Sequence, residues 1–147
     1  MFDELRDLYD SVILERGRKP RNGTKLAVFD AEAKGDNPMC GDRVHVFVRH
    51  EAGRIAELGF AARGCAVSVA AADLMAEAVS GLSDSEALAL GNSFEKMTKT
   101  GLGDEQSLAT LRPLAGVAAY PSRIKCAMLP WVALAAALAG EGTASSE

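Results

Sequence analysis

Three cysteines are the residues of this sequence best suited to chemistry, and Cys40 has the most unusual surroundings. It lies in segment 37–42 (NPMCGD), where Pro38 fixes one backbone angle and Gly41 permits conformations that other residues avoid. Such a loop can present a thiol outward. The carboxylate of Asp42 can reach the same point in space if the chain bends sharply at Gly41. The segment therefore predicts a thiol and a carboxylate at one site.

Cys65 and Cys126 are predicted near the starts of helices. Cys65 follows Gly64, where a strand pattern gives way to a helix pattern, and the free N–H groups and dipole of a helix start favour a thiolate. Cys126 lies early in the last predicted helix, after Arg123 and Lys125, which is also an electropositive setting. Both positions are thus expected to favour the anionic form of the thiol.

Three thiols and one carboxylate match the ligand number of tetrahedral zinc, with soft sulfur donors and one harder oxygen that is displaced more readily. Structural zinc sites more often contain close pairs such as C-x-x-C, and this sequence has none. Spacing alone leaves two interpretations open. The cysteines form a metal site, or they are unrelated and one or two of them are buried as small hydrophobic residues.

The composition is that of one globular domain. The 147 residues include 16 Lys and Arg against 20 Asp and Glu, and the resulting net charge of −4 argues against a protein that coats nucleic acid. Hydrophobic residues make up 48% of the chain, but 26 residues are alanine and only 8 are aromatic. We therefore expect a core of small side chains on closely approaching helices.

Three further features bear on the cellular compartment. The odd number of cysteines argues against a secreted disulfide framework, and the acidic start MFDELRD lacks the order of a secretory signal. The longest apolar run, residues 127–139, is about 13 residues long, whereas a membrane span needs about 20. We expect a cytoplasmic protein without a membrane or nucleic-acid partner.

Strand patterns precede helix patterns along the chain, which indicates an α+β domain. Residues 51–53 are short enough to join two antiparallel strands, and residues 83–86 resemble a capping box. Periodicity predicts a helix over 2–17, strands over 26–28, 44–48 and 55–60, helices over about 67–78, from 83 onward, 104–118 and 122–138, and a disordered tail over 141–147. The expected fold is a single domain over 1–147, with a three-stranded antiparallel sheet packed on a set of helices that dominate the C-terminal half.

The remaining candidates have ordinary explanations. The basic loop 16–25 is either a solvated loop or a docking patch for an acidic partner. His45 and His50 fit a strand and need no catalytic role. The sequence contains no phosphate-binding loop and no H-E-x-x-H, G-x-S-x-G or P-C-x-x-C motif.

The cysteine motifs, taken in order, resemble those of the IscU/NifU-like iron–sulfur assembly family. The matching segments are NPMCGD at 37–42, GCAVS at 64–68 before an alanine-rich helix, RIKCAMLPW at 123–131, and the N-terminal LYDSVILERGRKPRN. The resemblance covers nearly the whole chain, and it implies the same α+β fold. Two departures from the IscU pattern resemble the SufU branch of the family: Lys125 replaces a histidine before Cys126, and the chain is longer between about Gly81 and Asp104.

For that branch the resemblance implies a zinc site with Cys40, Asp42, Cys65 and Cys126 as ligands. It also implies that Cys40 accepts persulfide sulfur from a PLP-dependent cysteine desulfurase of the SufS type, with SUF scaffold proteins as further partners. Arg123 is expected to be a supporting residue that steers the partner or stabilises thiolate charge, and the alternative is an ordinary surface residue of a helix. Two alternatives remain: a scaffold that transiently assembles an iron–sulfur cluster on these cysteines, and a metal-free interaction protein.

Overall fold

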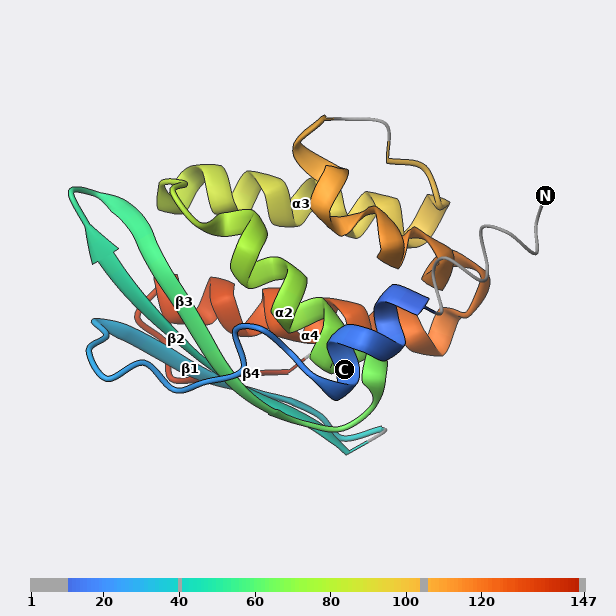
Figure 1. Ribbon diagram of the computed structural model, residues 1–147, viewed down its shortest axis with the longest axis horizontal. Coiled ribbons are helices and arrows are strands. Elements are labelled where there is room, and N and C mark those ends of the chain that lie inside the picture. Colours follow the sequence, from blue (N-terminus) through green and yellow to red (C-terminus); the bar gives the residue numbers. More distant parts are fainter. Residues whose placement is uncertain (1–10, 40, 104–105, 146–147) are drawn as a thin grey trace.

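The computed structural model describes residues 11–39, 41–103 and 106–145. Residues 11–18 are helical, while the earlier part of the predicted first helix lies outside the described residues. The other elements are β1 (Ala31–Asn37), β2 (Asp42–Glu51), β3 (Arg54–Arg63), α2 (Ala66–Val79), α3 (Asp84–Thr100), the 3₁₀-helix η1 (Gln106–Ala119), α4 (Pro121–Leu138) and β4 (Thr143–Ser145). The sheet lies on one side and the helices on the other (Figure 1), which confirms the predicted α+β fold.

Strands β1, β2 and β3 form an antiparallel meander. Valines 44, 46 and 48 of β2 are buried on one face of the strand, as their alternation predicted. On the opposite face His45 is partly exposed, whereas Phe47 is also buried. The turn between β2 and β3 consists of Ala52 and Gly53, both with positive φ, as in the tight hairpin turns that match strand twist. The predicted hairpin is therefore confirmed.

The first strand begins later than the sequence predicted. Leu26 and Val28 indicated a strand over 26–28, but β1 spans Ala31–Asn37. Its core-facing residues are small, and a Cβ added to Gly35 would lie 3.1 Å from the Cβ of Ala133 on α4. Alternation of alanine and glycine with polar residues carries little hydrophobic signal, so the pattern missed this strand. The close approach of α4 agrees with the expected small-residue core.

The sheet has four strands in the order β3-β2-β1-β4, one more than predicted, because the end of the chain returns to it. Residues Thr143–Ser145 form β4, which pairs in parallel with β1. Gly140, with a φ of +78°, follows α4, and the backbone N–H of Lys34 donates to the carbonyl of Gly142 at 2.9 Å. The polar segment 141–147 was expected to be a disordered tail. Pairing with the β1 edge uses backbone groups alone, so composition does not reveal it.

The helices cover the sheet, with α4 packed on β1 and β2 and α2 packed on β3. The predicted capping box opens α3: the Ser83 Oγ accepts from the Glu86 N–H at 3.2 Å, and the Glu86 carboxylate accepts from the Ser83 N–H at 2.9 Å. Between α3 and α4, the rings of Phe94 and Trp131 stack with centroids 5.4 Å apart. Among the helices that the structure describes, none has both the length and the apolar character needed to cross a bilayer.

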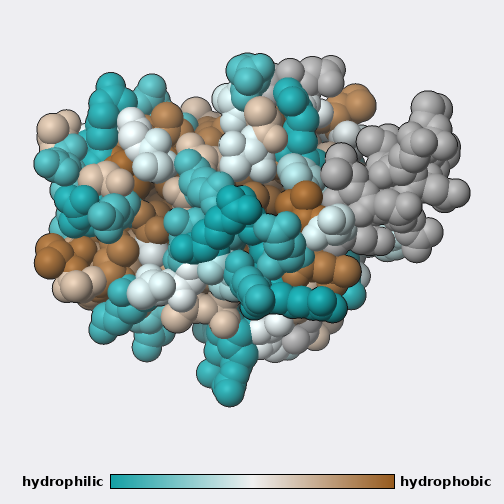
Figure 2. Space-filling model, in the orientation of Figure 1, coloured by the Kyte–Doolittle hydropathy of each residue, from teal (hydrophilic) through white to brown (hydrophobic). Residues whose placement is uncertain are grey.

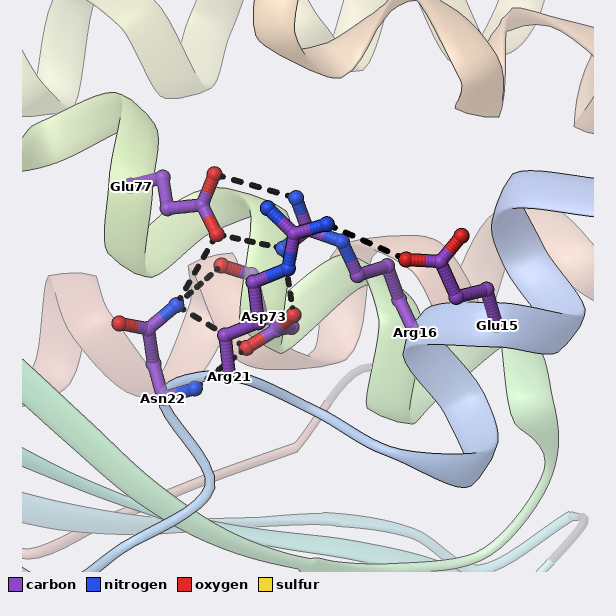
Figure 3. A network of polar contacts seen from close by, with 6 residues as sticks. All are labelled: Glu15, Arg16, Arg21, Asn22, Asp73 and Glu77. Carbon is purple, nitrogen blue, oxygen red and sulfur yellow. Dashed lines mark hydrogen bonds and ion pairs between the residues drawn. The ribbon is translucent and has the colours of Figure 1, made fainter.

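A buried charge network ties the N-terminal segment to α2 (Figure 3). The guanidinium of Arg16, only 8% exposed, donates to the carboxylates of Asp73 and Glu77, and the backbone N–H of Asn22 donates to Asp73 at 2.7 Å. Hydrogen bonding to Glu77, and then to Asp73, raises the pKa of Arg16 above its usual range. Hydrophilic side chains gather over this junction at the centre of the face shown in Figure 2. Arg16 therefore has a structural role, and it does not belong to a docking patch on the basic loop.

His50 links the sheet to the start of α3. Its Nδ1 contacts the Asp30 carboxylate, its Nε2 lies 2.7 Å from Asp84 Oδ1, and its backbone N–H donates to Asp30 at 2.7 Å. The hydrogen bond to Asp30, followed by that to Asp84, raises the pKa of His50, and the hydrogen bonds from His50 lower the pKa of Asp30. The position of His50 between two carboxylates thus favours the protonated, positively charged form of its side chain.

This linkage predicts a defined pH dependence of stability. Because the pKa of His50 is raised on folding, its contribution is fully present below the ordinary histidine pKa of about 6.5 and is lost as pH rises through the raised value. Asp30, whose pKa is lowered, contributes above its ordinary range and loses that contribution in acid. We expect His50→Gln to lower the free energy of unfolding by about 1 kcal/mol or less, most clearly between about pH 4.5 and 6.5. Urea denaturation of both proteins from pH 4 to 9 measures this, and a pH-independent difference would contradict it.

Candidate metal centre

Asp42 is the first residue of β2 and is 2% exposed. Its partner across the hairpin is Asn37, the last residue of β1. The turn between them ends at Gly41, which has a φ of +74° and donates its N–H to the Asn37 carbonyl at 2.8 Å. As the sequence predicted, the chain bends at Gly41, and the bend directs the carboxylate of Asp42 into the protein.

Both oxygens of the Asp42 carboxylate are engaged by the start of α2. Oδ1 accepts from the backbone N–H of Cys65 at 2.9 Å. Oδ2 accepts from the hydroxyl of Ser68 at 2.6 Å and lies 3.3 Å from the Sγ of Cys65. A carboxylate that is this well buried needs such donors to offset its desolvation. Strand β2 and helix α2 are therefore joined at this carboxylate.

Cys65 and Cys126 supply two thiols to the same place. Cys65 is the N-cap of α2 with extended backbone angles and is partly exposed, so its sulfur lies at the start of that helix. Cys126 lies in the second turn of α4, is 3% exposed, and has its Sγ 3.7 Å from the carbonyl of Ser122. Each thiol is therefore held at the beginning of a helix, as the sequence predicted.

The ligand atoms of Asp42, Cys65 and Cys126 all lie within 4.8 Å of one another. Two sulfurs and one carboxylate oxygen at this spacing fit the donor set of a zinc ion, which prefers thiolates and tolerates a carboxylate in a tetrahedral shell. Cys40, the fourth predicted ligand, lies outside the described residues, between the exposed Met39 and Gly41. The structure thus brings together three of the four predicted ligands.

Gly64 and Ser68 belong to the motif at 64–68, but no role at the site was predicted for either, although both lie against Asp42 in the structure. Ser68 is three residues after Cys65, a spacing that puts both side chains on the same face of a helix start, and this signal was available. Arg123 and Lys125 are both exposed on the first turns of α4, so the predicted supporting residue Arg123 is open to solvent.

Gly64 makes the close contact with Asp42 possible. Its φ is +147°, and a Cβ added there would lie 2.1 Å from Asp42 Oδ1, a distance at which the carboxylate must move. We expect Gly64→Ala to displace Asp42, to lower the free energy of unfolding by about 1–3 kcal/mol, and to weaken zinc binding about tenfold or more. Thermal unfolding and zinc competition with a chelator measure both effects.

Gly81→Ala is the matched control for this substitution. Gly81 also has a positive φ, of +86°, but a Cβ added there meets nothing within 4 Å. This variant therefore experiences the backbone strain without the collision. If Gly64→Ala and Gly81→Ala had the same effect on zinc affinity, the contact with Asp42 would not be the cause.

A cluster of thiols and a carboxylate, where the beginning of strand β2 meets two helix starts, defines the class: a small α+β protein with a candidate metal centre. Comparison with known proteins identifies the family. Residues 8–127 match the NifU-like N terminal domain. The chain therefore belongs to this family of iron–sulfur cluster assembly proteins, as its motifs indicated.

Individual relatives agree with this family. The chain is 36% identical over 138 residues to the iron–sulfur cluster assembly scaffold protein IscU of Streptococcus pyogenes serotype M1, covering 93% of this chain and 86% of the relative. It is 33% identical over 141 residues to the zinc-dependent sulfurtransferase SufU of Bacillus subtilis strain 168, covering 93% of each. A crystal structure described as a SUF-system cluster assembly scaffold protein from Fervidobacterium islandicum AW-1 superposes with a TM-score of 0.82 at 30% identity, covering 89% of this chain and 96% of that one.

Proposed function

We propose that this protein is a zinc-dependent sulfurtransferase that accepts persulfide sulfur on Cys40 from a PLP-dependent cysteine desulfurase of the SufS type. The observation that carries the proposal is the asymmetry of the site. Cys126 is buried and Cys65 is partly covered, whereas Cys40 follows Met39, which is 78% exposed, and precedes the exposed Gly41. An acceptor thiol must be accessible to the partner, so Cys40 is the cysteine best placed for it. The relative named SufU in Bacillus subtilis supports the zinc-dependent reading.

The transfer is a thiol–disulfide exchange. The thiolate of Cys40 attacks the outer sulfur of the persulfide on the desulfurase, and a new S–S bond forms. The S–S bond within the donor persulfide breaks, and the desulfurase cysteine leaves as a thiolate that later takes up a proton. Cys40 then carries the persulfide, and no net oxidation or reduction occurs.

The other residues of the site prepare Cys40 for this exchange. Asp42, Cys65 and Cys126, together with Cys40, would hold the zinc ion. A bound zinc ion keeps its thiol ligands deprotonated near neutral pH. Asp42 is fixed by donors from α2, and Cys65 and Cys126 are fixed by their helices, so these three groups stay in place while the loop that contains position 40 meets the partner.

The second candidate function is a scaffold that assembles an iron–sulfur cluster and passes it on. The Streptococcus pyogenes relative is named as such a scaffold, and cysteine thiolates are the usual ligands of these clusters. The cluster would then be cargo on the same cysteines. Lys125 weighs against the scaffold function. In the IscU pattern a histidine precedes the third cysteine, whereas this chain has a lysine there, which removes a potential ligand and adds a positive charge.

Three measurements on one preparation separate the candidates. Protein purified without chelator is analysed for metals and then added to a cysteine desulfurase with free cysteine. We expect about one equivalent of zinc and faster desulfurase turnover. Anaerobic reconstitution with iron and sulfide, followed by visible spectra, tests the scaffold. A stable and transferable cluster without stimulation of the desulfurase would overturn the sulfurtransferase proposal, and absence of both metal and stimulation would leave only an interaction protein.

A further inference from the structure

Ser68 lies inside the candidate metal centre but is not one of its predicted ligands. It is in the first turn of α2, three residues after Cys65, and is 1% exposed. Its Oγ donates to Asp42 Oδ2 at 2.6 Å and lies 3.7 Å from the Sγ of Cys65. The buried hydroxyl of Ser68 therefore has the Asp42 carboxylate as its hydrogen-bond partner.

The oxygen that Ser68 contacts is the one that faces the thiols. Oδ1 of Asp42 is held by the backbone N–H of Cys65 at 2.9 Å, on the helix side. Oδ2 lies 3.3 Å from the Cys65 sulfur, on the side of the ligand cluster. The Ser68 hydroxyl therefore acts on the oxygen beside the sulfur of the candidate ligand Cys65, while the backbone of α2 holds the other oxygen.

Ser68 is also close to the third ligand. Its Oγ lies 3.3 Å from the main-chain carbonyl of Cys126. Within a helix this carbonyl would accept from the N–H of residue 130, but Pro130 lies inside α4 and has no N–H. The Cys126 carbonyl, four residues before this proline, thus lies within reach of the Ser68 hydroxyl. One hydroxyl then contacts groups from β2 and α4 while its own helix carries Cys65.

We propose that Ser68 is a positioning residue of the zinc site: its hydroxyl donates to Asp42 Oδ2, the oxygen beside the Cys65 thiol, and holds that carboxylate in the ligating orientation. The inference rests on the metal site of the proposed function. Polar groups that orient a metal ligand typically change affinity about 10–100-fold when they are removed. Loss of this donor removes the 2.6 Å hydrogen bond at Asp42 Oδ2, so the carboxylate is held less firmly in its present orientation.

The test compares Ser68→Ala, Ser68→Thr and the control Ser80→Ala. Ser80 lies at the other end of α2 and is exposed, so its replacement makes the same chemical change away from the site. Protein loaded with zinc during expression is mixed with a chromophoric chelator, and the rate and extent of zinc transfer are measured. We expect Ser68→Ala to bind zinc about 10–100-fold more weakly, and Ser68→Thr and Ser80→Ala to stay near the unsubstituted protein. Alanine favours the helix, and the rate is measured from the loaded protein, so a less stable apo form does not prevent the measurement.

The Asp42→Asn variant tests whether Ser68 affects zinc binding through Asp42. If Ser68 acts through Asp42, adding Ser68→Ala to Asp42→Asn has little further effect on zinc affinity, as a double-mutant cycle requires of a coupled pair. Equal zinc affinity of Ser68→Ala and the unsubstituted protein would overturn the inference and leave the proposed function intact. An unsubstituted protein that binds no zinc would overturn the metal site itself. Loss of zinc in Ser68→Ala with no desulfurase stimulation by any form would uphold the role of Ser68 and contradict the sulfurtransferase proposal.

Discussion

Replacing Cys40 with alanine or serine is expected to return a partner cysteine desulfurase to its basal turnover rate. The expectation follows from the three thiols having unequal access. Cys126 is 3% exposed and is held within α4, and Cys65 caps α2 against Asp42. The Cys126 thiol is buried and the Cys65 thiol is only partly exposed, whereas the residues on either side of position 40 are exposed. Without the Cys40 sulfur no S–S bond forms, and a serine hydroxyl does not replace it, because it is far less nucleophilic at neutral pH.

The measurement is sulfide or alanine production by the desulfurase at saturating cysteine, with and without each variant. A second readout locates the sulfur. After a short incubation without reductant, mass spectrometry should find one added sulfur atom on the peptide that contains Cys40. Stimulation by Cys40→Ala equal to that of the unsubstituted protein would contradict the acceptor assignment, as would added sulfur on Cys65 or Cys126 alone.

Cys65→Ala and Cys126→Ala are the controls for metal loss. Each removes a predicted zinc ligand but keeps Cys40, so these variants separate the loss of zinc from the loss of the acceptor. If the acceptor assignment is right, they still take up sulfur on Cys40 when a stoichiometric persulfide donor is supplied. Cys40→Ala takes up none there, whatever its zinc content.

The sequence allowed the cysteine site to be predicted because each motif is local. Gly41 bends the chain beside Asp42, and Cys65 stands where a strand pattern becomes a helix pattern, so both positions follow from neighbouring residues. That Asp42, Cys65 and Cys126 lie close together is a property of the tertiary structure, and the spacing of these residues in the sequence does not reveal it. It was predicted from family resemblance, and the structure confirms that these three groups lie together.

The features that escaped prediction depend on contacts between distant segments. Strand β1 is made of alternating small and polar residues, and its place becomes clear only when Gly35 is seen against Ala133. Strand β4 forms because the edge of β1 offers backbone partners to a polar segment. Arg16 seemed to belong to a solvated basic loop until its buried partner Asp73 was visible, 57 residues away. In each case the local amino-acid composition gives little indication of the structure, which depends on a contact with a residue distant in the sequence.

Removing zinc is expected to lower the melting temperature of the protein by roughly 10 °C. The predicted ligands come from three separate elements: Asp42 from β2, Cys65 from the start of α2 and Cys126 from α4. A ligand present at about 1,000 times its dissociation constant stabilises the folded state by about 4 kcal/mol, and a domain of this size shifts by roughly 3 °C for each kcal/mol. Structural zinc in small peptides contributes about 10–16 kcal/mol, so this expectation is conservative.

Differential scanning calorimetry before and after chelation, with elemental analysis of both samples, measures the shift. Readdition of zinc should restore the melting temperature and magnesium should not, because thiolates select the softer ion. Asp42→Ala provides the matched control: it lacks one ligand, so its melting temperature should already be low and should respond less to the chelator. A zinc-loaded sample whose melting temperature is unchanged by complete zinc removal would contradict a role for the metal in joining the sheet to the helices. The packing of β1 on α4 gives the physical reason for this expectation. Where Gly35 and Ala133 bring the two elements together, small side chains bury little apolar area, and a metal bound by three elements would add cohesion there.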